Sequence, residues 1–187
     1  MGTRFALNRG SPAQQNRETL GGIGEQVEHL DAVRMIPEIA ITLVGFIGIV
    51  FALDHRPASK WSGADLLQMY VMTAGPMTAF FCAFAPDIFA TLFESPDHVW
   101  RLSNATLGAF HLAVIVPFLL RKSEVPTTLG QRILGGVGVL LILSHFLAAF
   151  GLIPWLAFVF ILGLLHQLCV GMYNFYLLLR ARAGDAS

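Results

Sequence analysis

The chain has 187 residues, of which 55% are hydrophobic and only 13% are charged, and its formal net charge at pH 7 is zero. Soluble domains carry about 25% charged residues, so this composition excludes an ordinary soluble enzyme domain. The zero net charge also removes the electrostatic basis for nucleic-acid binding, so no nucleic-acid partner is expected. The expected partner is the lipid bilayer.

Five apolar stretches fill most of the sequence after residue 35. A helix rises ~1.5 Å per residue, so about 20 residues cross a hydrocarbon layer of ~30 Å. The predicted fold class is therefore all-α, a polytopic membrane helical bundle of five transmembrane helices within residues 35–182. The stretches run roughly over Ile36–Leu53, Leu66–Phe84, Ala105–Leu120, Ile133–Ile153 and Trp155–Leu179.

Residues 1–34 form a polar N-terminal tail without the apolar run of a cleavable signal peptide, so the first stretch is expected to direct insertion. Four apolar residues of the tail recur at three- and four-residue spacing, which predicts a short amphipathic helix; disorder is the alternative. Acidic residues on its polar face argue against binding to an anionic lipid surface. The four apolar positions are Leu20, Ile23, Val27 and Leu30.

Polar residues and a proline predict where three of the helices begin. Ser62 with Asp65, and Thr128 with Gln131, have the spacing of capping boxes. The third helix is expected to begin near Pro96, before its apolar stretch, because proline suits the first helical position.

Two further prolines predict irregular backbone. Pro76 lies inside the second stretch, where it removes a backbone donor, frees the carbonyl of Met72 and should kink the helix. Gly151 and Pro154 mark the turn into the last stretch, and Pro154 is expected at the first position of that helix.

The distribution of basic residues predicts orientation. With five helices the two termini lie on opposite sides of the membrane. Basic residues close to helix ends gather on the side of the C-terminus, and the positive-inside rule makes that side cytoplasmic. The N-terminus is therefore predicted outside. The gathered residues are Arg56, Lys60, Arg121, Lys122, Arg132, Arg180 and Arg182.

Each stretch carries small or polar residues at helical spacing, and such stripes are typical of helix–helix contacts in membranes. The weakest stripe, in the first stretch, holds Ile41, Gly45 and Gly48. The others are Gln68, Met72, Gly75, Ala79 and Cys82; Asn104, Gly108, His111 and Ile115; Gly135, Gly138, Ile142, His145 and Ala149; and Gly163, Gln167, Gly171 and Asn174. Packing alone accounts for all of them.

Short motifs give the chain a resemblance. The glycine-punctuated segment 43–50, Trp61-Ser62 with Asp65, Pro86, and the run Val99-Trp100-Arg101-Leu102-Ser103 resemble a group of uncharacterised small bacterial membrane proteins. The resemblance implies a bacterial inner membrane. It implies no activity, cofactor or catalytic residue.

Three histidines lie inside the apolar stretches: His111, His145 and His166. Ionisable residues within the hydrocarbon are costly and mark functional sites by default. Counting residues from the predicted helix ends places all three at similar depths below the outer surface, where Glu38, Cys82 and Asp87 are also expected. Facing histidines suit the axial positions of a b-type haem, and three suit a metal. The alternatives are a proton or ion path and plain interhelical hydrogen bonding.

The sequence leaves three functions open. The favoured interpretation is a non-catalytic accessory or interaction subunit of a membrane assembly, with other membrane proteins or copies of itself as partners. The second is a redox protein in which His111, His145 and His166 bind haem or a metal. The third is an oligomeric channel or transporter that uses the stripe from Gln167 to Asn174. Enzyme motifs such as GxSxG, the P-loop and HExxH are absent from the sequence.

Overall fold

The computed structural model describes residues 12–53, 61–120 and 127–185, and within them the side chains of 32–53, 61–63, 65–120 and 127–180. All regular structure in these ranges is α-helical, and five helices are long and apolar enough to cross a membrane. The prediction of an all-α, multi-pass membrane protein is confirmed. The candidate spans are Ala32–Ala52, Asp65–Ala90, Pro96–Leu120, Leu129–Ala149 and Leu156–Arg180.

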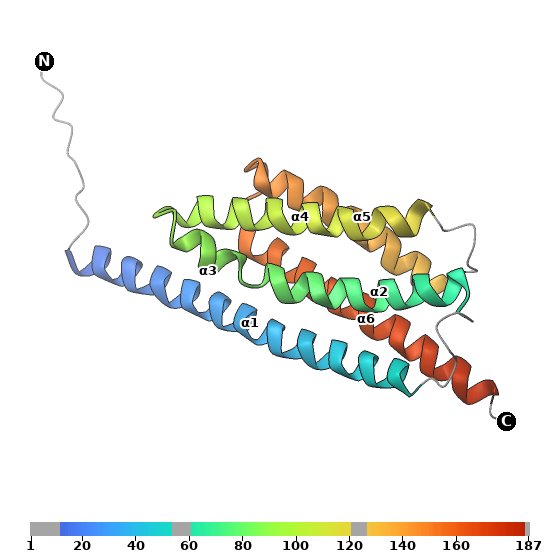
Figure 1. Cartoon of the computed structure of the whole chain (residues 1–187). Coiled ribbons are helices and arrows are strands. Elements are labelled where there is room, and N and C mark those ends of the chain that lie inside the picture. Colours follow the sequence, from blue (N-terminus) through green and yellow to red (C-terminus); the bar gives the residue numbers. More distant parts are fainter. Residues whose placement is uncertain (1–11, 54–60, 121–126, 186–187) are drawn as a thin grey trace, which may run out of the picture. The chain divides into compact units, whose positions relative to one another are not determined.

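The chain divides into two compact units, residues 1–32 and 33–187, and the second holds the helices that form the bundle. Within it, α4 lies beside α5, and α6 contacts α2, α4 and α5 (Figure 1). The helices are α1 (Pro12–Ala52), α2 (Gly63–Cys82), the short α3 (Ala85–Ala90), α4 (Pro96–Leu120), α5 (Leu129–Ala149) and α6 (Leu156–Asp185).

The polar tail is helical over its described part, because α1 begins at Pro12 and runs without a break into the first span. This helix covers the segment 20–30 for which an amphipathic helix was predicted. The side chains of that segment lie outside the described residues, so its faces stay a prediction.

Both predicted capping boxes are confirmed. At the start of α2, the Asp65 backbone N–H donates to Ser62 Oγ at 3.1 Å, and the Ser62 N–H donates to Asp65 Oδ2 at 2.9 Å. At the start of α5, Thr128 and Gln131 exchange the same pair of bonds, at 3.2 and 2.9 Å. These bonds satisfy amide groups that the first helical turn leaves unpaired.

Three prolines take different positions relative to the helices. The third span begins at Pro96, as predicted. Pro76 lies inside α2, which continues through it, and the second span ends as two helices because α2 stops at Cys82 and α3 follows. The expectation for Pro154 is wrong: α6 begins two residues later, at Leu156, after a turn in which Gly151 adopts a positive φ of 72°.

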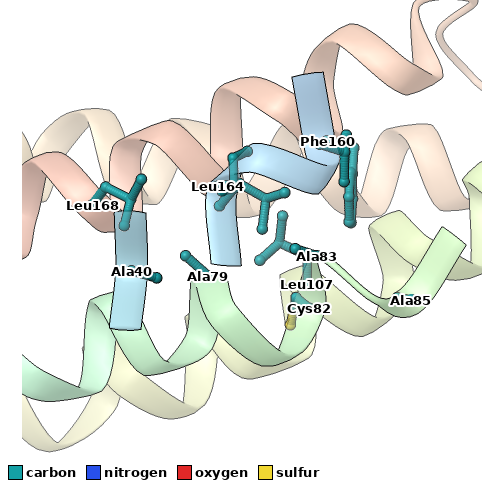
Figure 2. Packing of buried hydrophobic residues seen from close by; sticks show 11 residues of the cluster. Ala40, Ala79, Cys82, Ala83, Ala85, Leu107, Phe160, Leu164 and Leu168 are labelled. Atoms are coloured by element: carbon teal, nitrogen blue, oxygen red, sulfur yellow. The ribbon is translucent and has the colours of Figure 1, made fainter. Parts of the chain in front are cut away.

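The main apolar core joins α1, α2, α3, α4 and α6 (Figure 2). Alanines from the first three of these helices, such as Ala40 and Ala79, contribute small side chains, while α4 and α6 contribute large ones such as Leu107 and Phe160. Helix α5 supplies nothing to this cluster. Its own buried residues are Gly138, Leu141, His145 and Ala148, so two small residues, one histidine and one leucine hold it against the bundle.

Most of the predicted stripes face neighbouring helices. The α6 stripe is buried throughout, and the α2 and α4 stripes are buried except at Gln68 and Ile115, which are half-buried. The stripe predicted for the first helix is wrong, because Ile41, Gly45 and Gly48 are exposed and α1 instead buries the face that carries Val33, Ile36, Ala40 and Ile47. The larger apolar side chains of that face bury more surface.

Candidate functional site

Three helices bring the three intramembrane histidines together. His111 of α4 lies between the other two: its ring centroid is 5.1 Å from that of His166 in α6 and 6.1 Å from that of His145 in α5. All three are buried, with exposed fractions of 3%, 0% and 8% for His111, His145 and His166. The sequence places the three histidines at similar depths, and the structure shows that they also converge. These three residues are called the histidine cluster below.

Glycines make the space for the cluster. A Cβ atom on Gly138 of α5 would lie 3.0 Å from His166 Cε1 and 3.3 Å from His111 Nε2. A Cβ on Gly163 of α6 would collide with the ring of His145, and one on Gly108 of α4 would lie 3.0 Å from its Cβ. Each of the three helices thus provides one histidine and one glycine, and each glycine accommodates a histidine of another helix.

Hydrogen bonds fix the tautomer of His145. The Asn104 amide nitrogen donates to the carbonyls of Trp100 and Leu156, each at 2.9 Å, so the amide oxygen of Asn104 faces His145. That oxygen accepts only, and it lies 2.9 Å from His145 Nδ1. His145 Nδ1 must therefore carry the proton, and its Nε2 carries a bare lone pair. The Leu156 carbonyl belongs to the first residue of α6, so this network ties α4, α5 and the start of α6 together.

His166 is fixed in the opposite tautomer. Its Nε2 lies 3.0 Å from the backbone carbonyl of Leu134 in α5. A carbonyl accepts only, so Nε2 carries the proton and Nδ1 is left with the lone pair. The histidines on α5 and α6 therefore each donate from one ring nitrogen and hold the other as a free acceptor.

Several polar atoms at the cluster have no protein hydrogen-bond partner among the described residues. They are His111 Nδ1, His145 Nε2, His166 Nδ1 and, on the neighbouring residue, Gln167 Nε2. An unsatisfied buried donor or acceptor costs about 1–3 kcal/mol. Plain packing polarity would normally pair these atoms, so their concentration at one place is unusual for a purely structural contact.

A cavity of about 60 Å³ adjoins the cluster between α2, α4, α5 and α6. Apolar residues and two glycines form much of its wall, among them Val114 and Gly135. Its polar lining comes from His111, Gln131, His166, Gln167 and Asn174. We call this space the histidine cavity. Residues from two separate sequence patterns line it: two of the histidines, His111 and His166, and Gln167 and Asn174 of the α6 stripe.

Gln131 and Asn174 form the polar end of the cavity. Gln131 Nε2 donates to Asn174 Oδ1 at 2.8 Å, and Asn174 Nδ2 donates to the Val170 carbonyl at 2.8 Å. Sequence reasoning assigned Gln131 to helix capping alone and Asn104 to packing alone. The signal for Asn104 was its helical spacing with Gly108 and His111, whereas nothing in the sequence connects Gln131 with Asn174.

The other polar residues expected near the histidines make separate contacts. Cys82 is buried in the main apolar core, and Asp87 of α3 forms an ion pair with Arg34 of α1 at 3.6 Å, where both side chains are largely exposed. Glu38 is exposed on α1. The cluster is thus built from imidazole and amide groups.

The haem or metal interpretation gains no support from the arrangement. The cavity of about 60 Å³ is several times smaller than the 300–1,000 Å³ of typical cofactor pockets, and the His111 and His166 rings already lie in contact. Within the residues that the structure describes, no three His, Cys, Asp or Glu side chains are arranged to hold a metal ion. Cofactor binding by His111, His145 and His166 therefore stays a prediction from the sequence.

Comparisons of the chain with protein-family models, with curated proteins and with solved structures gave no match. The resemblance to small bacterial membrane proteins accordingly stays a prediction, and functional inference rests on the geometry of the site.

Proposed function

We propose that the protein moves protons within the membrane, and that the histidine cluster is the site that holds them. The observation that carries this proposal is that His111 and His166 line the same cavity as Gln131, Gln167 and Asn174. Intramembrane histidines that face a polar cavity are typical of proton relays.

The chemistry of the cluster supports a proton as the cargo. Two of its imidazoles hold a free lone pair, and each can accept a proton while its other nitrogen keeps its hydrogen bond. The volume is consistent with a small cargo, because about 60 Å³ holds a few water molecules, each of which needs ~10–15 Å³ of such space.

The proposal also names the membrane in which the protein lies and its orientation there. We place it in a bacterial inner membrane with its N-terminus outside and its C-terminus in the cytoplasm, from the resemblance and from the basic residues near the helix ends. With that orientation, the Gln131–Asn174 end of the cavity lies on the cytoplasmic side. A role as an accessory or interaction subunit, with other membrane proteins or a second copy as partners, stays a prediction from the sequence.

Proton movement can be tested in liposomes. Purified protein is reconstituted, a potassium diffusion potential is imposed, and an enclosed pH-sensitive dye reports proton entry. We expect flux above that of protein-free liposomes, and a loss of at least tenfold in His166→Gln. His98→Gln is the matched control, because His98 is an exposed histidine at the start of α4.

Two results would contradict the proposal: no flux above protein-free liposomes, or equal loss in the His166 and His98 variants. Circular dichroism and gel filtration of each variant establish that a loss of flux is not a loss of fold. An absorbance spectrum of the same sample also tests haem binding, since a Soret band that His111→Ala removes would restore the redox interpretation.

A further inference from the structure

The histidine cavity is elongated along the helices. On α5 its lining runs from Gln131 to Gly138, and on α6 from His166 to Asn174. At ~1.5 Å per residue each run spans about 10–12 Å. A volume of about 60 Å³ over that length leaves room for little more than a single file of water molecules.

One end of the cavity lies at the boundary of the membrane-spanning region. Gln131 lies in the first turn of α5, whose candidate span begins at Leu129, and Phe118 lines the cavity close to the end of α4. The other end stops at the histidine cluster. The cavity therefore covers only the half of the bundle where α5 begins.

The opposite half of the bundle is filled. Leu107, Phe160 and Leu164 have no exposed surface, and His145 and Asn104 are likewise fully buried between α4, α5 and α6. None of these side chains lines the cavity. Two hydrogen bonds cross this filled half, one donated by His145 Nδ1 to the Asn104 amide oxygen and one donated by the Asn104 amide nitrogen to the Leu156 carbonyl.

Polar groups make water the expected occupant of the open half. Empty cavities in proteins are apolar, whereas a polar cavity with room for a water molecule is normally hydrated. Three side chains that line this one carry a buried polar atom with no protein partner, namely His111, His166 and Gln167. Together they present both donor and acceptor groups.

We propose that the histidine cavity is a water-filled half-channel, which connects His111 and His166 to the side of the membrane where α5 begins and is closed on the other side of the cluster. This inference rests on the proposed function for its meaning, because it states from which side the cluster receives its protons. Water would reach the cluster from one side only, so the proton flux proposed above would cross the filled half through His145, whose ring centroid lies 6.1 Å from that of His111.

Adjacent glycines on α5 provide a matched test. Gly135 lines the cavity and Gly136 does not, and a Cβ atom on either would have no neighbour within 4 Å. Gly135→Cys and Gly136→Cys are made in a chain whose own cysteines, Cys82 and Cys169, are replaced by alanine. Silver ions, which are small enough to follow a file of water, are added to right-side-out or inside-out vesicles, and the remaining thiol is then labelled after denaturation.

We expect silver to reduce labelling of Gly135→Cys at least tenfold, and only in the vesicle orientation that exposes the start of α5. Labelling of Gly136→Cys should not change in either orientation. Protection of Gly135→Cys from both sides would mean a continuous pore, and absence of protection from either side would mean a dry cavity. Either of these results overturns the proposal.

A second pair of cysteine variants, on α4, provides the same test if a glycine variant does not fold. Val114→Cys on α4 lines the cavity, and Val116→Cys on the same helix is exposed and does not. The same one-sided protection is expected for Val114→Cys alone. Failure of this proposal is distinct from failure of the proposed function. His166-dependent flux without silver protection refutes only the half-channel, and protection without such flux refutes only proton movement.

Discussion

The ring of His145 occupies the place that a side chain at position 163 would need. Gly163 has no Cβ, and the imidazole fills that volume while Asn104 holds it by a hydrogen bond to Nδ1. Because the ring is fully buried and bonded, it cannot swing away at little cost. At the scale of residues, the site thus depends on glycines as much as on histidines.

Gly163→Ala should therefore destabilise the protein by about 1–3 kcal/mol, the usual cost of overpacking. Gly136→Ala is the control, since it meets no atom and improves helix propensity. The measurement is the midpoint of thermal unfolding in detergent. In the double variant Gly163→Ala with His145→Ala, most of the effect of the glycine change should disappear. Equal midpoints for the two single variants would show that the ring yields freely.

Asn104 should control the tautomer of His145. In Asn104→Leu, the His145 Nδ1–H loses its acceptor, at about 1–3 kcal/mol for the unsatisfied group. We expect nitrogen NMR of labelled protein to show a single Nδ1–H tautomer of His145 in the parent chain and a mixture in the variant. Ser103→Ala is the control, because Ser103 bonds only to the Val99 carbonyl of its own helix. A tautomer that Asn104→Leu leaves unchanged would contradict this role.

At the scale of elements, helices α1 and α5 join the bundle by different means. Helix α1 packs an apolar face with Ile36 and Ala40 into the main core, whereas α5 buries Gly138, Leu141 and His145 outside that core and contacts Leu156 and Val159 through Ala148. A glycine stripe is therefore not a sufficient sign of a contact, since α1 turns its own glycines outward.

Leucine substitutions on α1 should separate its two faces. Ala40→Leu enlarges a residue with no exposed surface and should cost about 1–3 kcal/mol. Gly45→Leu projects into space with no neighbour within 4 Å and should leave stability unchanged or slightly higher. Thermal unfolding in detergent measures both. A larger loss for Gly45→Leu would indicate that this face contacts another chain.

At the scale of the whole molecule, the polar interior is divided unequally along the bundle. Beyond the histidine cluster the interior is filled by apolar side chains together with Ser103 and Asn104, and on the side where α5 begins it holds a polar cavity. A protein that only needed to assemble would gain from filling that space, because each unsatisfied polar group costs free energy.

Topology is the prediction that belongs to this scale. A reporter fused after Asp185 should read cytoplasmic, and one fused at the N-terminus should read external, because five spans separate the termini and the basic residues favour the C-terminal side. Reversed readings from both fusions would refute the charge argument. Identical readings from the two would refute the number of spans.

The local features of this protein are determined by its sequence. Apolar length predicted the spans, the capping boxes at Ser62 and Thr128 predicted two helix starts, and Pro96 predicted a third. These succeed because each depends on hydrogen bonds or burial within one segment. The similar depth of the histidines also followed from counting residues along each helix.

Only the tertiary structure decided which faces meet. Depth does not specify the rotation of a helix about its axis, so the sequence showed neither that the rings of His111 and His166 touch nor that Gly45 faces outward. The same holds for the pairing of Gln131 with Asn174, which lie on different helices. Rotation is set by how side chains of several helices fill a shared space at once, and that space exists only in the assembled bundle.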